Sequence, residues 1–543
     1  MRKIFILITL ATISLLSCKS KEEKEAEKAE KEKKKISKRN TWINKSNSYS
    51  DLFLDSMNVE KFIADRQVPD SISNRMRSFY NARNYQFGWF NSKGFTEQAY
   101  GFWNLYDHYV TYSADSSLLD KPFQKKMNAL MEDEFSVGNN GSSVRETELM
   151  MTVNFLRYSL ANFADGYVKR KEMERFVPFT KRDPMEWADS LLNKKHKDNK
   201  YFEDINPEYA KLKEQLNKYF QIAQNGGWPL PGSAKLPIKK GQSTDAVLAI
   251  KKHLQLTGDL PGNDTTMVFD DAMENGIRSY QERYGYTPTG IVNADLLKHL
   301  NVPATERVKQ LLLNLDRMRW MPSQPKGKLI VINIPEYKLH ALEDGKEVFD
   351  MDVVVGKVGH HTSMFTGTLN QVVFSPHWNV PPSIVKNEIL PAMAKNPNYL
   401  AENNMEIVEN NGELPTIRQL PGEKNALGKV KFLFPNSFNI YLHDTPSKSL
   451  FSRDKRAFSH GCIRVSEPPK LASYLLEDEG SWDDDRIFEA MNAGTEKFVK
   501  LKDPAEVFIT YYTAWVDERG RLNFREDIYG MDKEVAGRMF TKI

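Results

Sequence analysis

The spacing of apolar residues changes once along the chain, at the turn formed by residues 325–327. Before this turn apolar side chains recur at helical spacing, as in the segment 209–220. After it the pattern is strand-like, with a hairpin turn at residues 344–345. The predicted strands are 328–334, 338–342 and 348–355. This pattern predicts an α+β multidomain protein with a helical first part and a β-rich last part.

The N-terminus has the pattern of an export signal. Arg2 and Lys3 precede an apolar run over residues 4–16, which is shorter than the roughly 20 residues needed to span a bilayer. The run ends in Leu-Leu-Ser-Cys, with Cys18 last, and this resembles the lipobox of bacterial lipoproteins. The resemblance implies removal of residues 1–17, a lipid on Cys18, and anchoring to a membrane facing the periplasm, expected to be the outer membrane of a Gram-negative bacterium. The alternative is an ordinary cleaved signal followed by a chance cysteine.

Residues 18–40 carry Cys18 and a charged tether. The stretch 19–39 holds ten basic and six acidic residues and has too few apolar side chains to build a core. The whole chain has 76 Lys and Arg against 72 Asp and Glu, a net charge of +4. Since the tether and the signal account for more than this excess, the remaining body is slightly negative. A basic nucleic-acid-binding protein is therefore excluded, and no nucleic-acid partner is expected.

The helical part divides into three segments. Residues 41–234 predict a helical scaffold domain that ends at the breaker cluster 225–229, and its apolar stripes are read as core. Residues 235–302 predict three short helices separated by glycine turns, an order that resembles the small three-helix peptidoglycan-binding domain. The resemblance implies either glycan binding or a spacer role. Residues 303–327 are predicted to be a helical linker.

The β-rich part contains a group of residues suited to nucleophilic catalysis. His443 and Asp444 precede the run Ser459-His460-Gly461-Cys462-Ile463-Arg464. A thiolate attacks an amide carbonyl well, and an imidazole can take the thiol proton and pass it to the leaving amine. A glycine beside the nucleophile leaves backbone N–H groups open to an oxyanion. A protonated histidine and Arg464 nearby are expected to lower the pKa of the thiol and to favour the thiolate.

Other readings of the same residues are weaker. A lone cysteine is often a small buried hydrophobic residue. Two histidines and a cysteine could bind a metal, but the chain has only two cysteines, Cys18 and Cys462, and no ligand spacing typical of a zinc site. A disulfide framework is excluded for the same reason. Neither a metal nor a cofactor is expected.

Fifteen residues separate His443 from Ser459, and together the two segments resemble the L,D-transpeptidase catalytic domain. The resemblance implies that Cys462 is the nucleophile and His443 the general base and acid. Gly461 and Cys462 would contribute their backbone N–H groups to the oxyanion hole, and the Asp444 backbone would orient His443. The residues expected to bind substrate or to support the motif are Arg464, Ser459, His460 and Trp378. His460 is expected to be structural rather than the base.

The resemblance extends to the order of domains, which is similar to that of the large Gram-negative L,D-transpeptidases. It implies a catalytic domain over 328–500, with a capping insertion at about 381–428 whose entry, 374–384, contains Trp378. Residues 501–543 are expected to be a C-terminal strand and hairpin extension. Two departures from the family pattern are Ser363, where proline is common, and the lipobox, which affects location rather than chemistry.

These features lead to a murein L,D-transpeptidase hypothesis. Its partners would be a peptidoglycan tetrapeptide stem as donor, a stem amine as acceptor, and a membrane through the lipid on Cys18. The same site could instead act as an L,D-carboxypeptidase or endopeptidase, exchange D-amino acids, or attach a protein to the wall. A hypothesis of another class is a non-catalytic tether between lipid and wall, which an altered His443 or Cys462 would have favoured.

Overall fold

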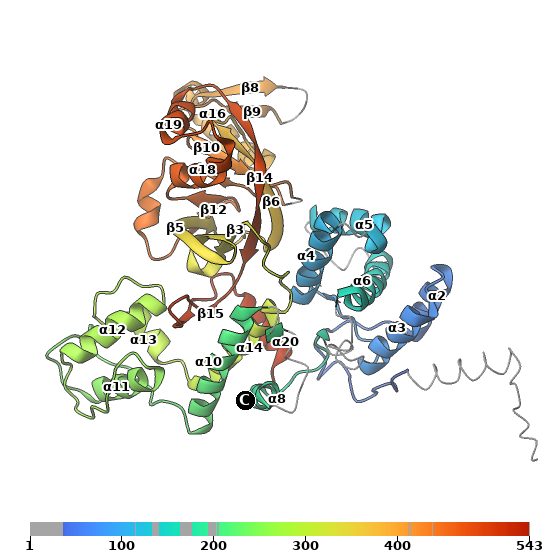
Figure 1. Cartoon of the computed structure of the whole chain (residues 1–543), viewed down its shortest axis with the longest axis vertical. Coiled ribbons are helices and arrows are strands. Elements are labelled where there is room, and N and C mark those ends of the chain that lie inside the picture. The colour runs from blue at the N-terminus through green and yellow to red at the C-terminus, as the bar shows by residue number, and fades with distance from the viewer. Residues whose placement is uncertain are drawn as a thin grey trace, which may run out of the picture.

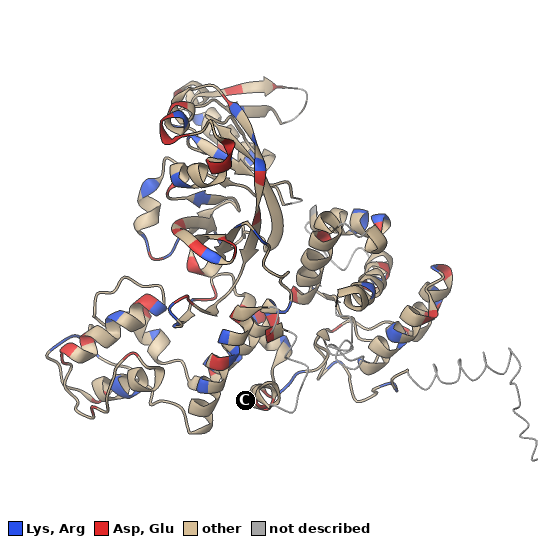
Figure 2. Cartoon of the chain, in the orientation of Figure 1, with Lys and Arg blue, Asp and Glu red and all other residues tan. Residues whose placement is uncertain are grey.

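The computed structural model describes residues 36–113, 116–132, 141–162, 176–193, 202–203, 206–410, 412, 414–436 and 438–541. The signal segment 1–17, Cys18 and most of the tether lie outside these residues. Figure 1 shows the β-rich part above a junction formed by α10 (Pro207–Gln224), α14 (Ala304–Met318) and α20 (Met531–Met539), with the three-helix module on one side and the scaffold helices on the other. Figure 2 shows acidic and basic residues interspersed over all three parts.

The scaffold helices begin where the sequence offers polar caps. The side chains of Asp55, Thr96, Asp183 and Asn206 accept backbone N–H groups in the first turns of α2, α4, α8 and α10. The helices of this part are α2 (Ser56–Asp65), α3 (Asp70–Ala82), α4 (Glu97–Tyr112), η1 (Ser116–Leu118), α5 (Lys121–Glu132), α6 (Gly141–Asn162), α8 (Pro184–Leu192) and α10 (Pro207–Gln224), and a two-stranded ribbon is formed by β1 (Phe90–Asn91) and β2 (Gly94–Phe95). The predicted stripe on 209–220 is confirmed, because Tyr209, Leu212, Leu216 and Phe220 are all buried on α10.

A buried carboxylate holds the scaffold core together. Glu148 on α6 is fully buried, and its two oxygens accept the N–H groups of Gly88 (2.7 Å) and Trp89 (2.9 Å). The Tyr80 hydroxyl donates to it as well, at 3.1 Å. Burial raises the pKa of Glu148 to about 7, although the backbone N–H groups oppose this shift. Glu148 therefore ties the segment 88–89 to α3 and α6.

Replacing Glu148 by glutamine is expected to lower the free energy of unfolding of the scaffold by about 2 kcal/mol, because the new NH₂ group must face one of two buried N–H donors. Thermal and urea unfolding followed by circular dichroism would measure this. The matched control is Glu146→Gln on the same helix, where the side chain is 43% exposed and a change below about 0.5 kcal/mol is expected. Equal effects of the two variants would contradict the role given to Glu148.

The three-helix module consists of α11 (Asp245–Thr257), α12 (Asp271–Arg283) and α13 (Ala294–Leu300), as the sequence predicts. Thr244, Asp270 and Asn293 cap the three helices, and Gly258 ends α11 with a left-handed φ of +91°. Its apolar residues belong to the same continuous core as those of the scaffold. The module is therefore packed on the scaffold rather than suspended from it.

The segment predicted to be a helical linker is a core helix. Helix α14 (Ala304–Met318) buries Val308, Leu311, Leu312 and Leu315. It packs on α10, α8 and α20, and so lies between the scaffold and the end of the chain. The prediction of a linker was wrong about its role, because a helix with apolar residues at this spacing needs a partner surface. Helix α14 is therefore part of the core that joins the scaffold helices to α20.

The catalytic part is built on one curled sheet with the strand order β12-β5-β13-β11-β10-β6-β14-β3-β4. Strand β5 also pairs with β4, so the sheet closes on itself. Its strands are β3 (Lys328–Asn333), β4 (Lys338–Glu343), β5 (Lys346–Gly356), β6 (Phe365–Phe374), β10 (Val430–Leu433), β11 (Leu442–His443), β12 (Ala457–Ser459), β13 (Ile463–Val465) and β14 (Lys497–Thr510). The three predicted strands and the turn between the second and third are confirmed by β3, β4 and β5.

One face of this sheet packs on helices. The core there includes Val353, Val372, Phe432, Leu442 and Ile463. It is completed by α18 (Pro468–Leu476) and α19 (Asp484–Asn492), and the short helices of this part are η4 (Ile334–Glu336), η6 (Lys448–Ser452) and η7 (Glu477–Glu479). Because side chains alternate along a strand, the residues next to these core positions point to the opposite face.

An insertion between β6 and β10 forms a small capping unit. Its sheet has the order β7-β9-β8, and Val380, Val385, Ile389 and Ile417 form its own core. The elements are β7 (Trp378–Asn379), α15 (Pro382–Ile384), the π-helical turn η5 (Val385–Ile389), α16 (Leu390–Lys395), α17 (Tyr399–Glu402), β8 (Met405–Glu409) and β9 (Thr416–Gln419). The unit thus occupies the region in which the sequence places a cap.

The C-terminal segment differs from the expectation in two ways. The boundary predicted at residue 500 falls inside β14, which pairs with both β3 and β6 and so belongs to the catalytic sheet. Beyond it, the predicted hairpin is β15 (Ala514–Val516) and β16 (Leu522–Phe524), but a further helix, α20 (Met531–Met539), follows. The hairpin and α20 bury most of their apolar residues in the scaffold core, while Met531 at the start of α20 packs on the core of the β-rich part. Over the residues described, no helix has the length and apolarity needed to cross a bilayer.

Candidate active site

The register of three neighbouring strands brings the predicted site residues together. His443 on β11 pairs with Lys431 on β10 and with Arg464 on β13. Paired residues on adjacent strands point to the same face, so Lys431, His443 and Arg464 form a row across the sheet. Their neighbours Phe432, Leu442 and Ile463 point into the core. Cys462 stands immediately before β13, at the end of this row.

His443 is buried, with 4% of its surface exposed, and its Nδ1 lies 2.5 Å from the carbonyl oxygen of Asp444. A carbonyl can only accept, so Nδ1 carries the proton and Nε2 keeps its lone pair. Burial, followed by the positive charge of Arg464, lowers the pKa of His443 to about 4. The ring is therefore neutral near pH 7 and its free nitrogen is a base. This is the backbone contact that the sequence analysis expects of Asp444.

Asp444 is fixed by its own side chain. Its carboxyl group accepts the backbone N–H groups of Lys429 (2.9 Å) and Thr445 (2.7 Å) and pairs with Lys448 Nζ at 2.6 Å. Gly428 lies against this carboxyl with a φ of +63°, and a Cβ added there would overlap the carboxyl atoms. A glycine at the base of the capping insertion therefore allows Asp444 to reach its place.

Cys462 rests as a thiol rather than a thiolate. Its Sγ lies 3.7 Å from the carbonyl oxygen of Asn439, and among the described contacts no hydrogen bond joins it to His443. Burial raises the pKa of the thiol above its ordinary value, and this outweighs the lowering by the hydrogen bonds from Tyr441 and by Arg464. The expected lowering of the thiol pKa by Arg464 is thus present but is not dominant. The expected lowering by a protonated histidine is absent, because His443 is neutral. Transfer of the thiol proton to His443 requires a hydrogen bond that the described contacts do not include.

We therefore expect the alkylation rate of Cys462 by iodoacetamide to rise with pH and to keep rising at about pH 9, because a raised pKa delays formation of the thiolate. The measurement is mass spectrometry of the Cys462 peptide at a series of pH values, with a free cysteine peptide as reference. A plateau below about pH 8 would mean that the site stabilises the thiolate at rest.

The loop 459–462, which ends in the nucleophile, is stabilised by hydrogen bonds between its own residues. Ser459 is buried, and its hydroxyl donates to the Cys462 carbonyl at 2.6 Å and accepts the Gly461 N–H at 3.1 Å. The Gly461 N–H is therefore engaged, and the expectation that it contributes to an oxyanion hole does not hold for this arrangement. The N–H of Cys462 has no hydrogen-bond partner among the described residues and is the backbone donor left for that task. Gly461 is needed for another reason, its φ of +116°.

Arg464, His460 and Trp378 lie in different surroundings. Arg464 forms no ion pair with any acidic residue that the structure describes, and its Nε is buried without a partner. His460 has a side chain that is 37% exposed, and its Nε2 lies 3.3 Å from a carboxyl oxygen of Glu388 in the cap. Trp378 lies on β7, pairs with Gln419, and packs on the core of the cap. Of these three residues, Arg464 is the one near the nucleophile that keeps an unused hydrogen-bond donor, its Nε–H group.

Two residues near the nucleophile escaped the sequence analysis. Tyr441 lowers the pKa of the Cys462 thiol, and its ring lies 5.8 Å from that of His443. It stands two residues before His443, a spacing that would place both side chains on the same face of an extended segment, and this was a signal that could have found it. Thr362 donates to the carbonyl oxygen of Gly461 at 2.7 Å, from 99 residues away, and no local signal points to it. Over the described residues, no group of three or more His, Cys, Asp or Glu side chains is arranged to hold a metal ion.

Comparison with known families gives each part a counterpart. Residues 327–496 match the family model described as the L,D-transpeptidase catalytic domain. This part of the chain is an L,D-transpeptidase catalytic domain. Residues 74–216 match the family described as "Scaffold domain", and residues 243–300 match "Putative peptidoglycan binding domain". In its set of domains the chain is thus similar to the large, Gram-negative type of L,D-transpeptidase.

Relatives and solved structures share parts of the chain. A protein of Haemophilus influenzae named "Putative L,D-transpeptidase" is 35% identical over 243 residues, which are 42% of this chain and 49% of that protein. The chain thus spans about half the length of this curated relative. Among solved structures, an L,D-transpeptidase of Stackebrandtia nassauensis is 14% identical, covering 50% of this chain and 96% of that one, with a TM-score of 0.22. L,D-transpeptidase 3 of Mycobacterium tuberculosis with a faropenem-derived adduct is 15% identical, covering 34% of this chain and 60% of that one, with a TM-score of 0.18. TM-scores this low support no inference, and the assignment rests on the family model and the sequence relative.

Proposed function

We propose that the chain is a cysteine-dependent murein L,D-transpeptidase that forms 3→3 peptidoglycan crosslinks. The observation that carries this proposal is the placement of Cys462 beside the row of His443 and Arg464, within the L,D-transpeptidase domain. The row supplies a neutral base and a cation without an acidic partner next to a thiol. An acyl transfer from a peptide that bears a carboxylate needs these three groups.

In the first half-reaction the sulfur of Cys462 attacks the carbonyl carbon at the L-centre of diaminopimelate in a tetrapeptide stem. Nε2 of His443 takes the thiol proton as the C–S bond forms. The same proton then passes to the nitrogen of the terminal D-Ala as the C–N bond breaks, and D-Ala leaves. The product is a thioester on Cys462. Because the Cys462 thiol and the His443 imidazole are both neutral before the reaction, His443 can accept the thiol proton without first losing one of its own.

In the second half-reaction the amine of another stem attacks the thioester carbonyl. A new C–N bond forms, the C–S bond breaks, and His443 takes a proton from the amine and returns it to the sulfur. During both steps negative charge collects on the carbonyl oxygen. The N–H of Cys462 is the backbone donor in reach of it, and Arg464 is suited to hold a carboxylate of the stem because none of the described acidic residues neutralises it.

The test is incubation of purified sacculi with the full chain, followed by muramidase digestion and mass spectrometry of the muropeptides. The proposal predicts new 3→3 dimers and free D-Ala with the wild-type chain. Tripeptides without dimers would make the chain an L,D-carboxypeptidase, and loss of existing dimers would make it an endopeptidase. If no muropeptide changes, the chain acts as a tether instead of an enzyme.

We also propose that the mature chain is exported and carries lipid on Cys18, at the outer membrane and facing the periplasm. The support is the signal-like segment ending in Leu-Leu-Ser-Cys. Radiolabelled palmitate should enter the wild-type chain and not the Cys18→Ala chain, and fractionation should find the wild type in membranes. Equal labelling of the two chains would rule out Cys18 as the lipid site.

A further inference from the structure

A buried threonine connects the catalytic loop to the end of strand β5. Thr362 is 3% exposed, and its hydroxyl accepts the Gly356 N–H at 2.9 Å and donates to the Gly461 carbonyl at 2.7 Å. That carbonyl belongs to the peptide group joining Gly461 to Cys462, whose N–H is the donor discussed above. A single hydroxyl thus fixes the peptide plane next to the nucleophile.

A tyrosine from the far end of the chain holds the same loop. The hydroxyl of Tyr529 donates to the Gly356 carbonyl at 2.6 Å and accepts the Thr362 N–H at 3.3 Å. Its ring stacks on His361 with centroids 4.1 Å apart and planes at 15°. Tyr529 therefore closes the loop 356–362 against β5 and determines where the Thr362 hydroxyl points.

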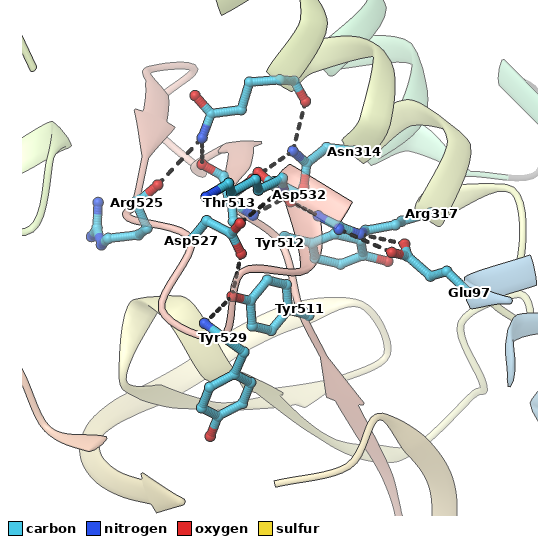
Figure 3. A network of polar contacts seen from close by, with 12 residues as sticks. Glu97, Asn314, Arg317, Tyr511, Tyr512, Thr513, Arg525, Asp527, Tyr529 and Asp532 are labelled. Carbon is cyan, nitrogen blue, oxygen red and sulfur yellow. Dashed lines mark hydrogen bonds and ion pairs between the residues drawn. The ribbon is translucent and has the colours of Figure 1, made fainter. Parts of the chain in front are cut away.

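Tyr529 is in turn held by a polar network, drawn in Figure 3. Its N–H donates to the Tyr511 hydroxyl at 2.9 Å, and that hydroxyl donates to Asp527 at 2.7 Å. Asp527 also accepts the Lys533 N–H at 3.0 Å, at the start of α20. The C-terminal segment 525–533 is therefore hydrogen-bonded to Tyr511, the residue that follows β14.

The network continues into the scaffold. Asp532 accepts a hydrogen bond from Thr513 at 2.6 Å and pairs with Arg317 of α14 at 2.5 Å. Arg317 is 6% exposed and also pairs with Glu97 of α4 at 2.5 Å (Figure 3). A continuous set of contacts therefore runs from a scaffold helix through the C-terminal segment to the peptide beside Cys462.

We propose that Thr362 and Tyr529 are positioning residues for the transpeptidase reaction, and that the scaffold and the C-terminal segment hold the catalytic loop in its reactive form through them. The inference rests on the proposed function. Neither side chain contacts the sulfur in this network. Their role is to fix the Gly461–Cys462 peptide, and with it the Cys462 N–H, toward the place where the oxyanion forms.

The test measures kcat and KM for D-Ala release from a tetrapeptide stem. Tyr529→Phe and Thr362→Val should each lower kcat about 10- to 100-fold with KM within about twofold, and Thr362→Ser, which keeps the hydroxyl, should recover activity to within about threefold of wild type. The matched control is Tyr474→Phe. Tyr474 is buried in the same domain, and its hydroxyl donates to the Leu342 carbonyl at 2.9 Å, a contact outside the network that holds the loop. Loss of this hydroxyl in Tyr474→Phe should leave kcat within about twofold of the wild-type value.

Equal losses of kcat in Tyr529→Phe and Tyr474→Phe, or failure of Thr362→Ser to recover activity, would overturn the proposal, because a general loss of packing would then suffice. Alkylation of Cys462 by iodoacetamide over a range of pH values gives a readout that does not need turnover. Tyr529→Phe should shift the pH midpoint of alkylation, because a displaced Gly461–Cys462 peptide changes the burial that raises the pKa of the thiol. Tyr474→Phe should not shift it, and unchanged midpoints in both variants would also overturn the proposal. If the wild-type chain releases no D-Ala, the proposed function fails while the alkylation result still decides the positioning role.

Discussion

Replacing Cys462 by alanine is expected to abolish release of D-Ala from a tetrapeptide stem, with a loss of at least about 10⁴-fold. The side chain removed is the sole thiol that the structure describes, and the base beside it has nothing else to activate. His443 should keep its place in this variant, because its Nδ1 bond to Asp444 does not involve the sulfur. The loss should therefore appear in kcat, with the melting temperature unchanged. High-performance liquid chromatography of derivatised D-Ala would measure it.

The control for this variant is Cys18→Ala, which removes the other cysteine of the chain. Its activity on a soluble stem peptide should equal that of the wild type, because the proposed role of Cys18 is attachment and not chemistry. Release of D-Ala by the Cys462→Ala chain at a rate near the wild type would require a different nucleophile.

Replacing Gly428 by alanine is expected to lower kcat about 10²-fold, although the residue contacts neither the sulfur nor the imidazole in the described structure. The added methyl group would overlap the Asp444 carboxyl, which must then move. Because the Asp444 carbonyl orients the His443 ring, the base would leave its working position. Steady-state kinetics on the stem peptide would measure the loss.

Gly480→Ala is the matched control for this effect. Gly480 has a similar φ, +56°, but a Cβ there meets no atom within 4 Å. Both variants carry the strain of a left-handed backbone at a non-glycine residue, so a similar small loss of stability is expected in each. Activity lost equally in the two would show that strain, rather than displacement of Asp444, is the cause.

The sequence predicted those parts of the structure that local patterns determine. Strand alternation from residue 328 onward located β3, β4 and β5, because period-two burial appears directly in the residue order. The motif around His443 and Cys462 was recognisable since its spacing is that of a known family. The Asp444 backbone contact followed from the same resemblance, and the structure contains that hydrogen bond.

The parts that were missed depend on contacts between distant segments. Tyr529 reaches Gly356 from 173 residues away, and α20 enters a core formed mostly by residues more than 200 positions earlier. The Ser459 hydroxyl occupies the Gly461 N–H, which only the folded loop could reveal. The raised pKa of the Cys462 thiol likewise depends on burial, a property of the assembled domain that the nearby charge of Arg464 does not override.

The central claim is that Cys462 becomes acylated during turnover. The most direct test is to mix the full chain with a tetrapeptide stem, stop the reaction with acid within the first turnovers, and record the intact mass. The account predicts a population heavier by one tripeptide acyl group, and proteolysis should locate that group on the peptide containing Cys462. An unmodified chain that nevertheless releases D-Ala, or an acyl group on another residue, would contradict it.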